Sequence, residues 1–143
     1  MKSGSDSGLG AELRPSAGPT RATAYDVVPY PSYCHPQSHP DRLGVAGRLF
    51  GLPGAPVESC RMLELGCGDG SNMRPLAWKF PGSRFVGVDL AGTAIQAGRV
   101  AAADLGLKNL ELNQGDIAQV PLDGERFDYV VAHGVYSWVP VSV

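Results

Sequence analysis

The most informative stretch of the sequence is Leu63-Glu64-Leu65-Gly66-Cys67-Gly68-Asp69-Gly70-Ser71-Asn72. Its apolar beginning predicts a short strand from about Arg61, and its glycines predict a tight turn into a helix whose start is limited by Pro75. Such a turn lets a ligand approach the backbone where helix N–H groups converge, which favours a nucleotide or nucleoside. A plain tight turn without a ligand is the alternative interpretation of the glycines alone.

The alternation of strand and helix continues along the chain. Residues 84–90 predict a second strand, and the Ala-rich residues 93–105 predict a helix that ends at a glycine. A third strand is expected over 110–112, ending near Gln114, and the apolar run 127–132 is typical of a strand buried on both faces. This order predicts an α/β fold with a Rossmann-like open parallel sheet.

The N-terminal part differs in composition from the rest. Residues 1–23 hold too few large apolar side chains to offset the entropy of ordering them, and they predict a disordered tail. Residues 24–56 predict a strap rich in Pro and Tyr, followed by a helix that begins near Pro40. The ligand-binding domain is expected over 57–143. Its two tryptophans, Trp78 and Trp138, are expected to be packing residues.

Composition excludes several classes of partner. The 143 residues, 43% of them hydrophobic, fit one ordinary domain, and the net charge of -2 provides no basic field for nucleic acid or an anionic membrane. The three cysteines are irregularly spaced and do not predict a disulfide framework. No apolar run has the length of a signal peptide or a membrane helix. We therefore expect a cytoplasmic protein.

Acidic residues near the expected strand ends define the class of ligand. Glu64 lies two residues before the first glycine, where it would repel a phosphate and attract a cation. S-adenosylmethionine carries a sulfonium and an ammonium group and no phosphate, so it suits this position. A glutamate bonded to neighbouring backbone N–H groups is the alternative.

Two further acidic positions suit an adenosine. Asp89 follows Gly70 by 19 residues, close to the spacing of about 20 at which a carboxylate binds ribose hydroxyls, although NAD would use it in the same way. Asp116 and Ile117 follow the third strand and suit adenine, by a hydrogen bond and by apolar packing. Capping of a helix is the alternative role for Asp116.

Together these motifs resemble class I S-adenosylmethionine-dependent methyltransferases. Residues 64–70 are similar to the first motif of that family, Val88-Asp89 to the second and 115–117 to the third. The resemblance implies a strand order of 3-2-1-4 and a cofactor site around the carboxyl ends of the strands. The cofactor contacts expected from the motifs and from the chemistry are Tyr30, Glu64, Gly66, Cys67, Gly68, Gly70, Asp89, Leu90, Asp116, Ile117 and His133.

A closer likeness lies outside these motifs. Residues 25–30, 39–43 and 132–140 resemble a bacterial group that joins this domain to a methyltransferase regulatory domain. Some members of that group modify protein lysines, which implies a protein lysine as a methyl acceptor. In full-length members three more strands and a long C-terminal region follow, so the resemblance implies a C-terminally truncated sheet. Its apolar strand at 127–132 would have an unpaired edge that favours self-association.

Candidate catalytic residues follow the fourth expected strand. His133 and Tyr136 lie where an acceptor would meet the methyl group, and a neutral His133 can accept a proton. Backbone hydrogen bonding and packing are the alternative roles. The aromatic faces of Tyr30 and Tyr33 would attract a sulfonium, unless they only anchor the strap. No metal is expected, because the nearby candidate ligands fall short of a closed zinc site: Cys34, His35 and His39.

Three functions therefore compete. The first is a methyltransferase catalytic domain, the second is a fragment of a nicotinamide-dependent oxidoreductase, and the third is a truncated protein that binds the cofactor weakly with little or no turnover. Glu64 argues against the second, and so does Ser71, which stands where the dinucleotide fingerprint has its third glycine.

Overall fold

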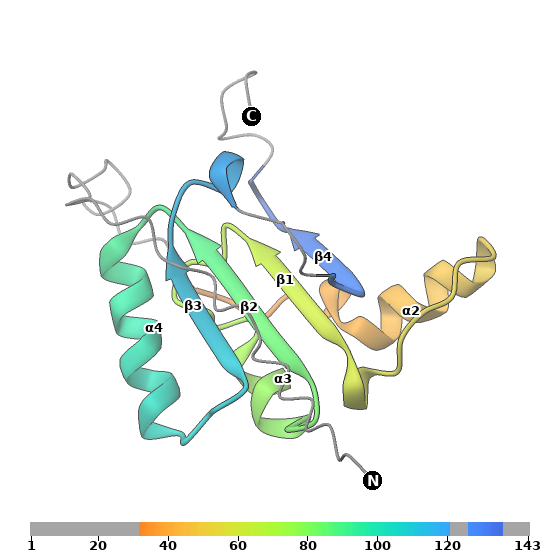
Figure 1. Cartoon of the computed structure of the whole chain (residues 1–143), viewed down its shortest axis with the longest axis horizontal. Coiled ribbons are helices and arrows are strands. Elements are labelled where there is room, and N and C mark those ends of the chain that lie inside the picture. Colours follow the sequence, from red (N-terminus) through yellow and green to blue (C-terminus); the bar gives the residue numbers. More distant parts are fainter. Residues whose placement is uncertain (1–31, 121–125, 136–143) are drawn as a thin grey trace, which may run out of the picture.

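The structure is a computed structural model that describes residues 32–120 and 126–135. Its centre, within those residues, is a sheet of four parallel strands in the order β3-β2-β1-β4 (Figure 1). The strands are β1 (Arg61–Leu65), β2 (Arg84–Asp89), β3 (Leu110–Gln114) and β4 (Tyr129–Ala132). This arrangement confirms the predicted Rossmann-like open parallel sheet.

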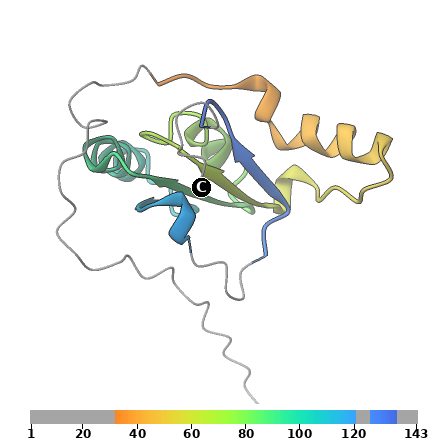
Figure 2. The same ribbon diagram turned by 90° about the horizontal axis from the view of Figure 1, so that it is seen from above.

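Helices cover this sheet unevenly. The described α-helices are α2 (Pro40–Leu49), α3 (Arg74–Lys79) and α4 (Gly92–Asp104), and α3 and α4 pack on one face (Figure 2). Three short 3-10 helices are also described: η1 (Pro36–Ser38), η2 (Val57–Ser59) and η3 (Ile117–Gln119). Of these, η3 lies against the opposite face of the sheet (Figure 2). None of the described helices combines the length and apolarity needed to cross a bilayer.

The alternating directions of side chains along the strands divide the core into two clusters. Met62 and Phe85 are paired in register and fully buried on the side of α3 and α4, where Ile95 from α4 joins them. Leu63 and Val86 are also paired, and they lie in a smaller cluster on the other face with an apolar residue of η3. Burial on both faces explains why the buried inner positions of β1 and β2 carry no charged residue except Glu64.

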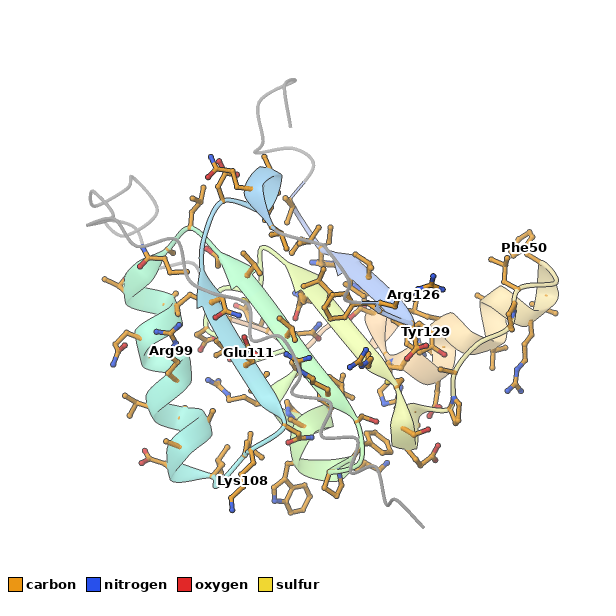
Figure 3. All side chains as sticks on the ribbon, in the orientation of Figure 1. Phe50, Arg99, Lys108, Glu111, Arg126 and Tyr129 are labelled. Atoms are coloured by element: carbon orange, nitrogen blue, oxygen red, sulfur yellow. The ribbon has the colours of Figure 1, made fainter. Side chains whose placement is uncertain are left out.

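Tyr129 of β4 links the sheet to the segment around α2. Its hydroxyl donates a hydrogen bond to the carbonyl of Ala55 at 2.6 Å. A Cβ atom added at Gly44 would lie 2.9 Å from the same hydroxyl oxygen, so only a glycine lets α2 approach this closely. The helix begins at Pro40 as predicted, and its other end extends away from the sheet to Phe50, which is 84% exposed (Figure 3).

The prediction that the fourth strand is buried on both faces is wrong. Tyr129 and Val131 are buried, whereas Val130 is 59% exposed. The reason is that the apolar cluster on the side of Val130 is centred on β1 and β2 and does not cover β4. The strand also begins at Tyr129, two residues later than predicted, while β3 ends at Gln114, near its predicted end.

The prediction of a packing role for Trp78 is also wrong. Its side chain is 72% exposed, because α3 contacts the core through Leu76 and Ala77 on its other side. A helix as short as α3 buries only one narrow stripe of residues, and Trp78 lies off that stripe. Trp138 lies outside the described residues.

Asn109 holds the end of α3 against the sheet. Its side-chain nitrogen lies 3.1, 3.0 and 3.0 Å from the carbonyl oxygens of Ala77, Phe80 and Ser83. Its own carbonyl accepts a hydrogen bond from the N–H of Phe85 in β2 at 2.9 Å. One amide therefore satisfies carbonyl groups that the end of a helix leaves without partners.

Asn109→Ala should lower the free energy of unfolding by about 1–3 kcal/mol, because these carbonyls lose their donor. Urea unfolding followed by circular dichroism measures the change. Lys108→Ala, at the exposed neighbouring residue, is the control and should stay within about 0.5 kcal/mol of wild type (Figure 3). Equal unfolding curves for all three proteins would contradict this role for Asn109.

Candidate functional site

The turn after β1 has a backbone that requires its glycines. Gly66, Gly68 and Gly70 have φ angles of +72°, +56° and +73°, in the left-handed region that side chains disfavour. The N–H groups of Gly66 and Cys67 donate to the carbonyl of Val88 at 2.8 and 3.2 Å. The turn therefore folds over the end of β2, and it brings backbone N–H groups to the carboxyl edge of the sheet.

Asp89 connects this turn to the start of α4. Its Oδ2 atom accepts a hydrogen bond from the N–H of Gly68 at 2.7 Å, and its Oδ1 atom accepts one from the N–H of Ala91 at 2.8 Å. A carboxylate has about four lone-pair sites, so each oxygen can accept a further hydrogen bond. Since the side chain is only partly buried, hydroxyl groups of a ligand can reach it.

Glu64 is a buried carboxylate with one unpartnered oxygen. The residue is 3% exposed; Oε1 accepts a hydrogen bond from Nδ2 of Asn72 at 2.9 Å, and Oε2 has no hydrogen-bond partner among the described residues. Burial raises the pKa of Glu64 to about 7, the Asn72 hydrogen bond opposes that rise, and the nearby Asp89 carboxylate adds to it. The sequence left open that Glu64 bonds to neighbouring backbone N–H groups. In the described residues its carboxylate instead accepts a hydrogen bond from the Asn72 side chain.

The end of β3 adds Asp116 and Ile117 beside Asp89. The N–H of Gly115 donates to the carbonyl of Asp89 at 2.9 Å. Oδ1 of Asp116 accepts a hydrogen bond from the N–H of Ala118 at 2.9 Å, so the capping role that the sequence left open is present. Ile117 is partly buried against the smaller apolar cluster.

The two remaining predicted positions near the turn are Cys67 and Leu90. Cys67 is buried, and its sulfur lies where a Cβ atom at Gly87 would come within 2.6 Å, so it packs on β2. Burial raises the pKa of the Cys67 thiol well above its usual range, with the Asp89 and Glu64 carboxylates adding to the rise. The carbonyl of Leu90 accepts a hydrogen bond from Nε2 of Gln114 at 3.2 Å.

The described part of the strap, residues 32–38, lies against the turn after β1. The Cys34 thiol donates to the carbonyl of Ser71 at 3.3 Å. The N–H of His35 donates to Oδ1 of Asn72 at 2.7 Å, and Nδ2 of Asn72 donates to the hydroxyl oxygen of Ser38 at 3.0 Å. Figure 2 shows the strap on the same side of the sheet as α3, before it enters α2.

The strap also contacts the residue that follows β4. The rings of His35 and His133 are stacked, with centroids 3.5 Å apart and planes inclined by 20°. Nε2 of Gln37 lies 3.0 Å from Nε2 of His133. Desolvation lowers the pKa of His35, and the neighbouring His133 lowers it further. His133 is thus held beside the strap, next to the carboxyl ends of β1 and β4.

Several site residues were missed from the sequence. Asn72 was part of the glycine-rich stretch without a role, and Ser38 and Gln37 carried no motif. The sequence holds one signal for these residues: a polar side chain directly before an apolar helix pattern. That signal indicates Asn72 but neither Ser38 nor Gln37. Tyr33 is 65% exposed, whereas Tyr30 and Tyr136 lie outside the described residues.

Other proteins share this sequence and fold. Residues 56–142 match the family described as "Methyltransferase domain". Two uncharacterised proteins of Rickettsia prowazekii, RP028 and RP789, are 40% and 41% identical over 124 and 119 residues. These alignments cover 87% and 83% of this chain, and 50% and 22% of the relatives.

One solved structure is similar to this chain in both sequence and fold. The structure of PKMT2 from Rickettsia typhi in complex with AdoHcy superposes with a TM-score of 0.74 and 38% identity, over 80% of this chain and 22% of that one. The chain therefore spans half or less of the length of these proteins. With the family matched across the whole sheet, from before β1 to beyond β4, the chain belongs to the methyltransferase domain family and has its Rossmann-like fold.

Proposed function

We propose that this chain binds S-adenosylmethionine and forms the donor-binding part of a methyltransferase. The observation that carries the proposal is the buried carboxylate of Glu64, whose Oε2 atom has no hydrogen-bond partner in the described part of the chain. A buried anion of this kind is costly unless a cation or a proton compensates it. The donor carries two positive groups, whereas the pyrophosphate of NAD would add negative charge near Glu64 and Asp89.

The other predicted contacts lie at different strand ends, and we assign one portion of the donor to each. We assign the ribose to Asp89, whose oxygens already accept backbone N–H groups and keep further capacity. Asp116 and Ile117 are assigned to adenine, and the turn after β1 to the methionine portion. Leu90 and Cys67 would contribute backbone and packing. The complex of PKMT2 with AdoHcy supports the choice of ligand, because AdoHcy is the donor after it has lost its methyl group.

Methyl transfer is an in-line displacement, so the protein chiefly aligns the two reactants and excludes water. The acceptor's nucleophile bonds to the methyl carbon, the carbon–sulfur bond breaks, and the sulfur keeps its electron pair. We assign to His133 the role of accepting the proton that the nucleophile loses, because it lies at the carboxyl edge of the sheet beside the strap. Tyr136 as a second catalytic residue and Tyr30 over the sulfonium stay predictions.

The likeness to the bacterial group with a methyltransferase regulatory domain supports protein lysine as the acceptor. Two further features support proposals about the cellular compartment and about self-association. All three cysteines are free thiols, which suits a reducing compartment such as the cytoplasm. Val130 is exposed on β4, which pairs with β1 alone in the described part of the chain, and this supports self-association at that edge.

Asp89→Ala should weaken binding of S-adenosylhomocysteine about ten- to a hundredfold, because a ribose loses its charged acceptor and the turn loses its anchor. Isothermal titration calorimetry measures the affinity. Asp104→Ala removes the same charge from an exposed position on α4 and should leave the affinity unchanged. Tight binding of NAD by the wild-type protein, or unchanged affinity in Asp89→Ala, would refute the assignment.

Affinity for S-adenosylhomocysteine, which keeps the ammonium group, should rise about tenfold between pH 6 and pH 8, since the pKa of Glu64 is about 7 and the cation favours the ionised carboxylate. Glu64→Gln should bind weakly at every pH and lose this dependence.

Stability should change in the opposite direction. Because the pKa of Glu64 is raised in the folded state, protonated Glu64 stabilises the fold at low pH, and that contribution is lost as the pH rises through about 7. Glu64→Gln should remove this loss in urea unfolding measured from about pH 4.5, the ordinary pKa of a glutamate, to pH 8. A wild-type affinity that does not change with pH would count against Glu64 as the cation-binding group.

A further inference from the structure

The amide of Asn72 lies between the buried carboxylate and the strap. The residue is 7% exposed and follows the glycine turn. It makes three hydrogen bonds, with partners on two segments: the Glu64 carboxylate from β1, and the His35 N–H and Ser38 hydroxyl from the strap. Within the described residues no other hydrogen bond reaches the Glu64 carboxylate, so Asn72 is its hydrogen-bond anchor.

The orientation of the amide is fixed by the strap. A backbone N–H can only donate, so the N–H of His35 requires the oxygen of Asn72 to face it. The nitrogen of Asn72 must then face Oε1 of Glu64 and the Ser38 hydroxyl, at 2.9 and 3.0 Å. The two N–H donors and the oxygen are all engaged, and rotation of the amide by half a turn would break every one of these bonds.

This fixed amide has two consequences. It holds Oε1, and thereby leaves Oε2 as the carboxylate atom without a protein partner. It also holds the strap, whose other contacts reach the Ser71 carbonyl and the His133 ring. The Asn72 side chain therefore contributes both to the orientation of the Glu64 carboxylate and to the position of the strap.

We propose that Asn72 is the positioning residue for the amino-acid portion of the donor, and that it makes the docked strap a required wall of that part of the site. The inference rests on the proposed function and deepens it. Asn72 would act through Glu64 and the strap. The adenosine portion would depend on Asp89 and Asp116, whose described hydrogen bonds go to other groups.

The test compares two ligands that differ at one end. S-adenosylhomocysteine has the amino-acid portion, and 5′-methylthioadenosine has the same adenosine thioether without it. Asn72→Ala should weaken binding of S-adenosylhomocysteine at least tenfold and change that of methylthioadenosine less than about threefold, which is a selectivity of about 0.7 kcal/mol or more. Calorimetry on the full chain measures both affinities.

Three variants provide matched comparisons. Asn109→Ala removes a partly buried amide at the opposite end of the strands, so it should destabilise the fold without separating the two ligands. Ser38→Ala keeps the Glu64 contact and loses a strap bond, and it should weaken only S-adenosylhomocysteine, by less than Asn72→Ala. Asn72→Asp keeps an acceptor for His35 and loses the donor to Glu64, so it gives the same selectivity if the alanine variant does not fold.

A pH profile separates positioning from general destabilisation. The Asn72 hydrogen bond opposes the rise in the pKa of Glu64, so its loss should move the midpoint of the pH-dependent affinity to higher pH. Asn72→Ala leaves the neighbouring charged or titratable groups in place: Asp89, Cys67, His35 and His133. Equal losses for both ligands, or an unmoved midpoint, would overturn the inference. Failure of the wild-type protein to bind either ligand would instead overturn the proposed function.

Discussion

The buried carboxylate of Glu64, which has no compensating cation within residues 32–120 and 126–135, constrains the whole site. Glu64 is placed there by β1, because a strand buried on both faces has no exposed direction for its side chain. One oxygen is stabilised by Asn72, and the other is left for a proton or a ligand cation. The surrounding groups follow from this requirement: the strap supplies partners for Asn72, and Asp89 keeps the region negative.

The polar groups of the site can lie this close together because the backbone of α4 approaches the turn after β1 closely. At Gly98 of α4, an added Cβ atom would lie 2.2 Å from the carbonyl oxygen of Asp69, so α4 lies directly on the turn after β1. The parallel strands bring the ends of β1, β2 and β3 to the same edge, with Asp89 paired in register with Gln114. Residues far apart in the sequence therefore meet without long loops, as expected for ligand sites in open α/β sheets.

The sequence predicted the parallel sheet, because periodicity and glycine placement reflect local backbone requirements, and the strand order followed from the resemblance to class I methyltransferases. Glu64 and Asp89 lie near each other, as the motifs implied. The contacts of the strap were not predictable, since Ser38 and Asn72 meet across 34 residues and no spacing rule describes such a meeting. The exposure of Trp78 and Val130 was missed for a related reason: apolar character predicts burial only where another element covers the residue.

The stacked imidazoles have a consequence for the order in which the molecule forms. Gln37 and His133 are separated by 96 positions, so their contact closes nearly the whole described chain into one loop. Such closure carries an entropic cost that local contacts do not, and it becomes favourable only after β4 has joined β1. The contact between the strap and His133 should therefore form late in folding, whereas the contacts of the strap with Ser71 and Asn72 close shorter loops.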